Sequence, residues 1–144
     1  MCCRFDNCIF DNGCKKEALT AEKFSEIVEN NNLTVTDASD DPELDPEYVD
    51  MVLVAEDDKM YIQYWDMNSE ETAENMYDGN TQAYISEYSG SYVGRGGFNY
   101  EREEISGKDD EFVIISRVDD TLIIAETTEE YKDELKEIIE ELSY

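Results

Sequence analysis

The sequence predicts an α+β domain, an antiparallel sheet with packed helices, preceded by a short cysteine-rich segment. Three observations predict this class. The length of 144 residues fits one domain. The hydrophobic fraction of 40% and the sixteen aromatic residues exceed what a disordered acidic chain contains. Apolar stripes of helical spacing alternate with short β-rich runs, which gives the order α-βββ-α-βββ-α.

The first predicted helix spans roughly residues 20–30. Thr20 is a residue type favoured at a helix N-cap, and Leu19 and Phe24 have the spacing of a hydrophobic staple. The asparagine run 30–32 then ends the apolar stripe.

Three strands are expected after this helix, at 33–36, 52–56 and 60–65. The acidic, proline-containing loop 37–50 separates the first two. The last two flank the acidic turn 57–58 and are expected to form a hairpin.

A second helix is expected to open at Asn68, because Asn68 and Glu71 have the spacing of a capping box. Gly79 is a candidate interruption of this helix. Residues 89–97 contain four of the seven glycines and are expected to form a loop. The glycines of this loop match neither a phosphate-binding loop nor a dinucleotide fingerprint.

Three further strands are expected near 98–104, 112–118 and 121–125. The last helix follows, with Thr127 and Glu130 at capping-box spacing. Its apolar stripe consists of Tyr131, Leu135, Ile138, Ile139 and Leu142. The acidic turns of the two hairpins occupy matching places, which is compatible with a weak internal duplication.

All four cysteines lie within the first fourteen residues, so we expect a cysteine-rich segment at 1–18 and one acidic domain at 19–144. Free thiols, disulfides and a zinc site are the alternatives. A zinc site would use Cys3, Cys8 and Cys14, since adjacent Cys2 and Cys3 rarely face one metal. No CxxC pair is present, and we expect no cofactor.

The net charge of −27 comes from 38 acidic and 11 basic residues. Residues 1–20 carry three of each sign, so the whole net charge belongs to the expected domain. Contacts to phosphates need positive charge, so we expect no direct binding to nucleic acid, and a basic protein as partner. No apolar run approaches a membrane span. The sequence does not indicate the oligomeric state.

The hairpin at 112–123, the segment 130–134 and the helix ending at 142–144 resemble uncharacterised small lipoproteins of Gram-positive gut bacteria. The segments 19–24 and 61–65 fit the same pattern, and the resemblance covers residues 19–144. It implies an extracellular, lipid-anchored accessory domain and transfers no catalytic residue. Residues 3–14 are similar to the first half of a short cysteine-rich bacterial module of unknown function.

A lipoprotein carries an apolar signal before its lipidated cysteine, and no such segment precedes Cys14. We therefore expect a cytoplasmic location for the chain as given, and an extracellular lipoprotein if the true start lies upstream.

We do not expect an enzyme. The absence of histidine excludes imidazole-based triads and proton shuttles. Among 38 acids, some pair always lies at the separation of glycosidase carboxylates, so no pair stands out. Calcium is disfavoured in the 37–50 loop, because an EF-hand register starting at Asp41 puts Pro46 and Val52 at its sixth and twelfth positions.

These observations favour a non-enzymatic acidic binding protein that imitates nucleic acid and inhibits a basic nucleic-acid-binding effector, as phage-type anti-restriction and anti-CRISPR inhibitors do. The alternative is the accessory domain implied by the resemblance, with an unknown ligand. The acids expected to bind the partner are Asp40, Asp41, Glu43, Asp45, Glu101, Glu103, Glu104, Asp109, Asp110, Glu111, Glu137 and Glu141.

Overall fold

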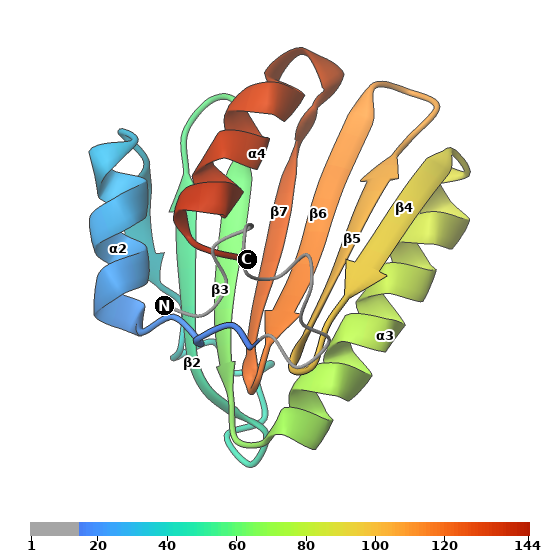
Figure 1. The fold of residues 1–144 in the computed structure, drawn as a ribbon. Helices are drawn as coiled ribbons and strands as arrows, with labels where there is room; N and C mark the ends of the chain where they lie inside the picture. Colours follow the sequence, from blue (N-terminus) through green and yellow to red (C-terminus); the bar gives the residue numbers. More distant parts are fainter. Residues whose placement is uncertain (1–14) are drawn as a thin grey trace.

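The computed structural model describes residues 15–144 (Figure 1). Its helices are α2 (Ala21–Asn30), α3 (Glu70–Tyr88) and α4 (Lys132–Glu141), with a short 3-10 helix η1 (Glu129–Tyr131) before α4. Its strands are β1 (Thr34–Asp37), β2 (Val49–Glu56), β3 (Tyr61–Met67), β4 (Ser91–Gly96), β5 (Tyr100–Ser106), β6 (Glu111–Val118) and β7 (Thr121–Thr128). The predicted cysteine chemistry falls outside the described residues.

The strands form one antiparallel seven-stranded sheet in the order β1-β2-β3-β7-β6-β5-β4. The α+β class and the alternation of helices with groups of strands are therefore confirmed. One strand was missed: the loop expected over 89–97 contains β4, which pairs with β5 from Ser91 to Gly96. Its six residues are all exposed, so it has no buried alternation that would predict a strand.

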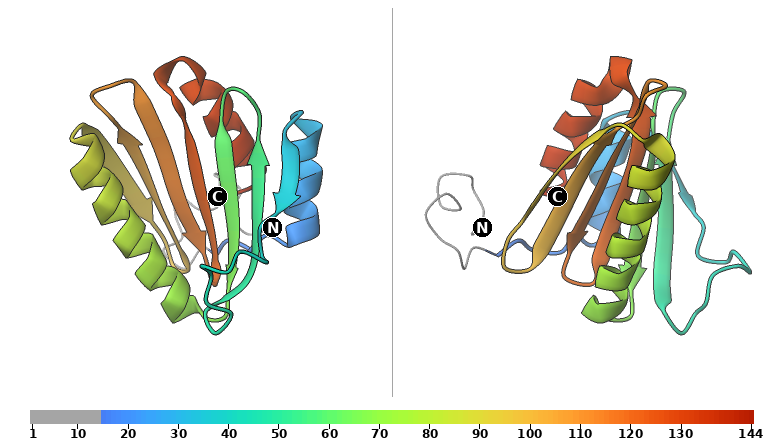
Figure 2. Two further views of the ribbon diagram at one scale, coloured as in Figure 1. Left: turned by 180° about the vertical axis from the view of Figure 1, so that it is seen from behind. Right: turned by 90° about the vertical axis from the view of Figure 1, so that its right-hand side faces the viewer.

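The helices cover both faces of the sheet (Figure 2). Helices α2 and α4 lie on one face and α3 lies on the other.

The larger core lies under α2 and α4. Phe24 of α2 stacks on Tyr64 of β3, with ring centroids 5.2 Å apart. The predicted stripe of the last helix is confirmed, because Leu135, Ile138 and Ile139 are buried here. The smaller core lies under α3 and contains Tyr77, Ile105, Val113, Ile115, Leu122 and Ile124.

Two predicted helix starts are wrong. Helix α3 is capped by Ser69, whose hydroxyl accepts from the N–H of Thr72, and Gly79 does not interrupt it. The Asn68 side chain instead donates to the carbonyl of Glu47. At the last helix, β7 continues to Thr128, and the Thr127 hydroxyl donates to the carbonyl of Lys59 at 2.8 Å. The Thr20 cap of α2 is confirmed.

Residues 15–19 run along one end of the sheet and are tied to it by hydrogen bonds. The Leu19 N–H donates to the Tyr144 hydroxyl at 3.0 Å, and the Tyr64 hydroxyl donates to the Leu19 carbonyl at 2.7 Å. Ala18 and Leu19 pack against the larger core. Within the described part of the chain, no helix is long and apolar enough to cross a membrane.

Candidate functional site

Three acidic connections meet at one end of the sheet, the upper end in Figure 1. They are the β2–β3 turn, the β5–β6 turn and the segment from the end of β7 into α4. The register brings them together: Tyr61 pairs with both Glu56 and Glu126, and Glu111 pairs with Thr128. The Glu129 N–H also donates to the Asp110 carbonyl at 3.0 Å.

We call this region the acidic end. Its nine carboxylates are Glu56, Asp57, Asp58, Asp109, Asp110, Glu111, Glu126, Glu129 and Glu130. Six are exposed, and Asp57, Glu111 and Glu126 are half-buried. A shallow groove of about 300 Å³ runs between the β2–β3 turn and the end of β7, lined by four of the nine acids and by Lys59.

Hydrogen bonds hold the half-buried carboxylates in place. Asp57 accepts from the backbone N–H of Lys59 at 2.8 Å, and Glu111 accepts from that of Asp109 at 2.8 Å. Glu126 accepts from the Tyr84 hydroxyl at 2.8 Å. Hydrogen bonds from two hairpin turns and from α3 therefore fix three of the nine carboxylates.

Three lysines lie among these acids. Lys132 pairs with Glu129 at 3.3 Å, and Lys59 pairs with Glu134 of α4 at 3.6 Å. Lys108 is exposed in the β5–β6 turn. The acidic end thus keeps six more negative than positive side chains.

The structure separates the acids expected to bind a partner. Asp109, Asp110 and Glu111 belong to the acidic end. Asp40, Asp41, Glu43 and Asp45 are exposed in the loop before β2, which lies at the opposite end of the sheet (Figure 1). Glu137 and Glu141 are exposed on α4.

The loop before β2 is shaped by its own side chains. Asp37, Asp41 and Asp45 each accept a hydrogen bond at 2.9 Å from the backbone N–H two residues later. The hydrogen bonds from Ser39 lower the pKa of Asp37. These carboxylates thus order the loop locally.

The acids of β5 are half-buried and mostly engaged within the fold. Glu101 pairs with Arg117 at 2.9 Å, and Glu104 pairs with Arg102 at 2.9 Å and with Lys136 at 3.2 Å. Arg117 is buried and also lies 3.6 and 3.7 Å from two carboxylates of α3. Burial raises the pKa of Glu103.

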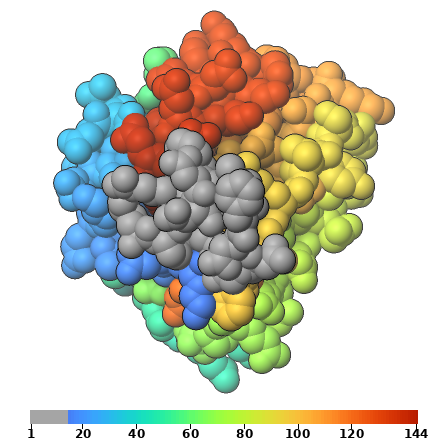
Figure 3. Space-filling view, viewed as in Figure 1, coloured from blue at the N-terminus to red at the C-terminus, as the bar shows by residue number. Residues whose placement is uncertain are grey.

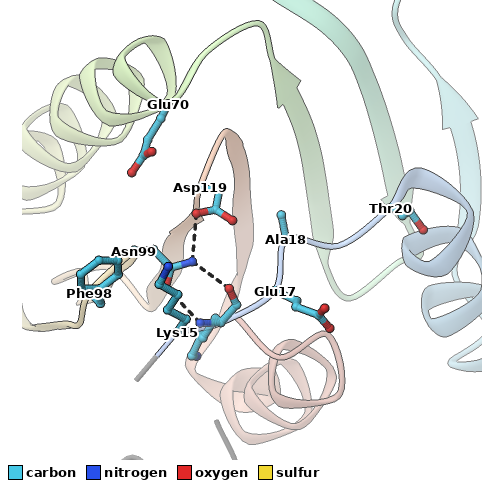
Figure 4. A pocket seen from close by; sticks show the side chains of 9 residues that line it. Lys15, Glu17, Ala18, Thr20, Glu70, Phe98, Asn99 and Asp119 are labelled. Carbon is cyan, nitrogen blue, oxygen red and sulfur yellow. Dashed lines mark hydrogen bonds between the residues drawn. The ribbon is translucent and has the colours of Figure 1, made fainter. Parts of the chain in front are cut away.

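A second hollow, of about 740 Å³, lies at the opposite end of the sheet (Figure 4). Lys15, Glu17, Glu70, Phe98 and Asp119 contribute side chains to its wall. Its lining mixes both signs of charge. The residues from 15 to 144 contain no group of three cysteine or carboxylate ligands arranged to hold a metal ion.

Six members of the acidic end were not among the acids predicted to bind a partner. The turn at Asp57 and Asp58 was recognised, but its proximity to the 109–111 turn depends on the pairing of β3 with β7. That pairing joins strands about sixty residues apart in the chain, and no local pattern specifies it.

No protein-family model and no curated protein matches the sequence. The structure is similar to the crystal structure of a GTP binding regulator from Thermotoga maritima. The TM-score is 0.52 at 12% sequence identity, over 86% of this chain and 87% of that one. At this identity the similarity concerns the fold alone.

Proposed function

We propose that this protein is a non-enzymatic inhibitor that uses the acidic end to occupy the nucleic-acid-binding groove of a basic protein. The observation that carries the proposal is the density of charge at that end. Nine carboxylates from three connections lie along the ends of five neighbouring strands, β2, β3, β7, β6 and β5.

The spacing of these charges resembles that of nucleic acid. Neighbouring strands are about 4.8 Å apart, so five strands span about 20 Å. Nine charges over that width give about one per 2 Å, against about one per 1.7 Å along duplex DNA. With three lysines set against three acids, the net density is about one per 3.3 Å, close to a single strand.

The exposure of most of these carboxylates, and the hydrogen bonds that hold the others, also favour binding of a basic protein. Six of the nine carboxylates are exposed and can reach a partner, while hydrogen bonds from the fold hold three others. Little conformational entropy then needs to be lost at the held carboxylates on binding. The negative electrostatic potential of the acidic end repels nucleic acid, so we propose no direct binding to it.

The proposal is tested by affinity capture from a host lysate at low and high salt, with mass spectrometry of the bound proteins. We expect a basic nucleic-acid-binding protein, released as salt shortens the screening length to about 8 Å and below. Added nucleic acid should compete for it. Captured proteins with a neutral or acidic contact surface would contradict the proposal.

Charge reversal locates the surface. The variant Asp58→Lys, Asp109→Lys, Glu130→Lys changes one exposed acid in each connection of the acidic end. The control variant Asp40→Lys, Glu43→Lys, Asp50→Lys makes the same change in charge at the opposite end of the sheet. We expect the first to weaken binding much more than the second. Equal weakening by both would mean that net charge alone drives binding.

A further inference from the structure

Strand β4 is an unprotected edge of the sheet. Among residues 15–144 it pairs with β5 on one side only, and all six of its residues are exposed. Edge strands are normally protected by charged residues, proline, bulges or a covering segment. In β4 only Arg95 is charged, proline is absent, and the pairing with β5 is regular. In Figure 3 the yellow surface of β4 lies open near the margin of the molecule.

The exposed apolar side chains gather at this edge. Among the described residues, four large hydrophobic side chains are markedly exposed, and three belong to β4 or to the turn after it. Their exposed fractions are 58% for Tyr92, 65% for Val93 and 62% for Phe98. Tyr92 and Val93 are consecutive in the strand and point to opposite faces, so this edge exposes an apolar side chain on each face.

The same edge lacks the acidic residues found elsewhere. Residues 88–100 contain no acid, although 38 of the 144 residues are acidic. Two lysines lie against this region: Lys15 Nζ is 4.7 Å from the Phe98 ring centroid, and Lys16 Nζ is 4.6 Å from that of Tyr100. The carboxylate of Glu103, on the neighbouring strand, lies against Gly94.

The backbone of β4 can accept another strand. The Gly97 N–H donates to the Tyr100 carbonyl at 2.9 Å, which fixes the alternation of hydrogen-bonded pairs between β4 and β5. By that alternation, the N–H and C=O groups of Tyr92, Gly94 and Gly96 point away from β5. These groups are available to an antiparallel partner.

We propose that β4 pairs with β4 of a second copy of this chain, with Val93 opposite Val93 of that copy. In this register Tyr92 lies opposite Gly94 and Arg95 lies opposite Ser91, so each large side chain faces a small one. The two arginines stay about 13 Å apart along the paired strands.

Charge makes this edge the least repulsive contact surface for a second copy. Two molecules of charge −27 repel each other, and the repulsion is least where both present an acid-free strand. Salt screens the repulsion, so self-association should strengthen as salt rises. Binding of a basic partner through the acidic end should weaken over the same range, which keeps the two proposals separable.

The experiment measures the mass in solution by sedimentation or light scattering, at about 50 and 500 mM salt. We expect twice the 16.6 kDa of one chain, with the dimer more populated at high salt. The variants Val93→Glu and Val93→Lys should each be monomeric, because like charges would face each other about 4.5 Å apart between Cα atoms. Mixing the two should restore a dimer.

The control is Tyr48→Glu, which adds a charge at the remaining exposed hydrophobic residue, away from β4. It should leave the dimer intact, and circular dichroism should show that all variants are folded. A wild-type monomer at both salt concentrations would overturn the proposal. A dimer that survives both Val93 substitutions, or an equimolar mixture that stays monomeric, would also overturn it.

Discussion

The Asn99 side-chain amide forms hydrogen bonds with both the N–H and the carbonyl of Lys16. The Lys16 N–H donates to Asn99 Oδ1 at 3.0 Å, and Asn99 Nδ2 donates to the Lys16 carbonyl at 2.7 Å (Figure 4). Nδ2 also donates to Asp119 Oδ1 at 2.9 Å. A buried amide in the β4–β5 turn thus joins the first described residues to the β6–β7 turn.

We expect Asn99→Ala to lower the free energy of unfolding by about 1–3 kcal/mol, because it leaves the half-buried groups of Lys16 and Asp119 without their hydrogen bonds. Thermal or denaturant unfolding measures the change. The control is Asn75→Ala, an exposed position on α3, which should change stability by less than about 0.5 kcal/mol. Equal stability of the two variants would mean that the Lys16 contact adds nothing.

Helix α4 provides a direct test of the larger core. Leu135→Ala or Ile138→Ala should each cost about 2–5 kcal/mol, because both side chains are buried between α4 and the sheet. Glu137→Ala lies on the exposed face of the same helix and serves as the control. Unchanged melting temperatures in both apolar variants would contradict the packing.

Helix α4 also shows what the sequence could predict. Its apolar residues recur with helical spacing, so the buried stripe followed from local pattern alone. Its first residue did not, because Thr127 extends β7 and bonds to Lys59, 68 positions away. Asn68 and Ser69 are both suitable N-caps, and tertiary contacts decide between them.

Strand β4 and the acidic end could not be predicted from the sequence, because both depend on which strands pair. Ser91–Gly96 buries no side chain, so it lacks the alternation that identifies a strand, and only pairing with β5 defines it. The acidic end depends on which strands are neighbours. Composition predicted an acidic surface, but sheet order determines which acids lie together.

Glu103 and Glu104 are adjacent on β5 and point to opposite faces, and their pKa values shift in opposite directions. Burial raises the pKa of Glu103. Burial also acts to raise the pKa of Glu104, but Arg102 and Lys136 outweigh it and lower that pKa below its usual value. Ionisation of Glu103 therefore opposes folding, whereas ionisation of Glu104 favours it.

At pH 7 we expect Glu103→Gln to stabilise the protein. We expect Glu104→Gln to destabilise it, by about 1–3 kcal/mol, because the buried Arg102 loses its charged partner. The Glu104 contribution is present above the unfolded pKa and is lost as pH falls through the lower folded pKa. The destabilisation caused by ionised Glu103 disappears as pH falls through the raised pKa that this carboxyl has in the folded protein. Both effects should therefore fade in acid, as measured by denaturant unfolding from pH 7 to 3. Effects of the same sign at pH 7 would contradict these assignments.

We expect the Lys16 amine to be acylated faster than that of an exposed lysine at pH 8. Burial lowers its pKa to about 8, and the nearby charges of Arg95 and Arg102 add to the shift. At pH 8 about half of its amines are then neutral, against roughly 0.3% for a lysine of ordinary pKa. Only the neutral amine reacts with an acylating reagent, so limited acetylation at pH 8 should modify Lys16 before the exposed Lys23 of α2. Peptide mass spectrometry measures the two rates across pH 6–10.

Arg95→Gln removes one of the neighbouring charges from an exposed position and should move the Lys16 profile to higher pH, with the Lys23 profile unchanged. If Lys16 reacts with the pH profile of Lys23 in the wild type, its amine does not experience the burial and positive field that lower its pKa.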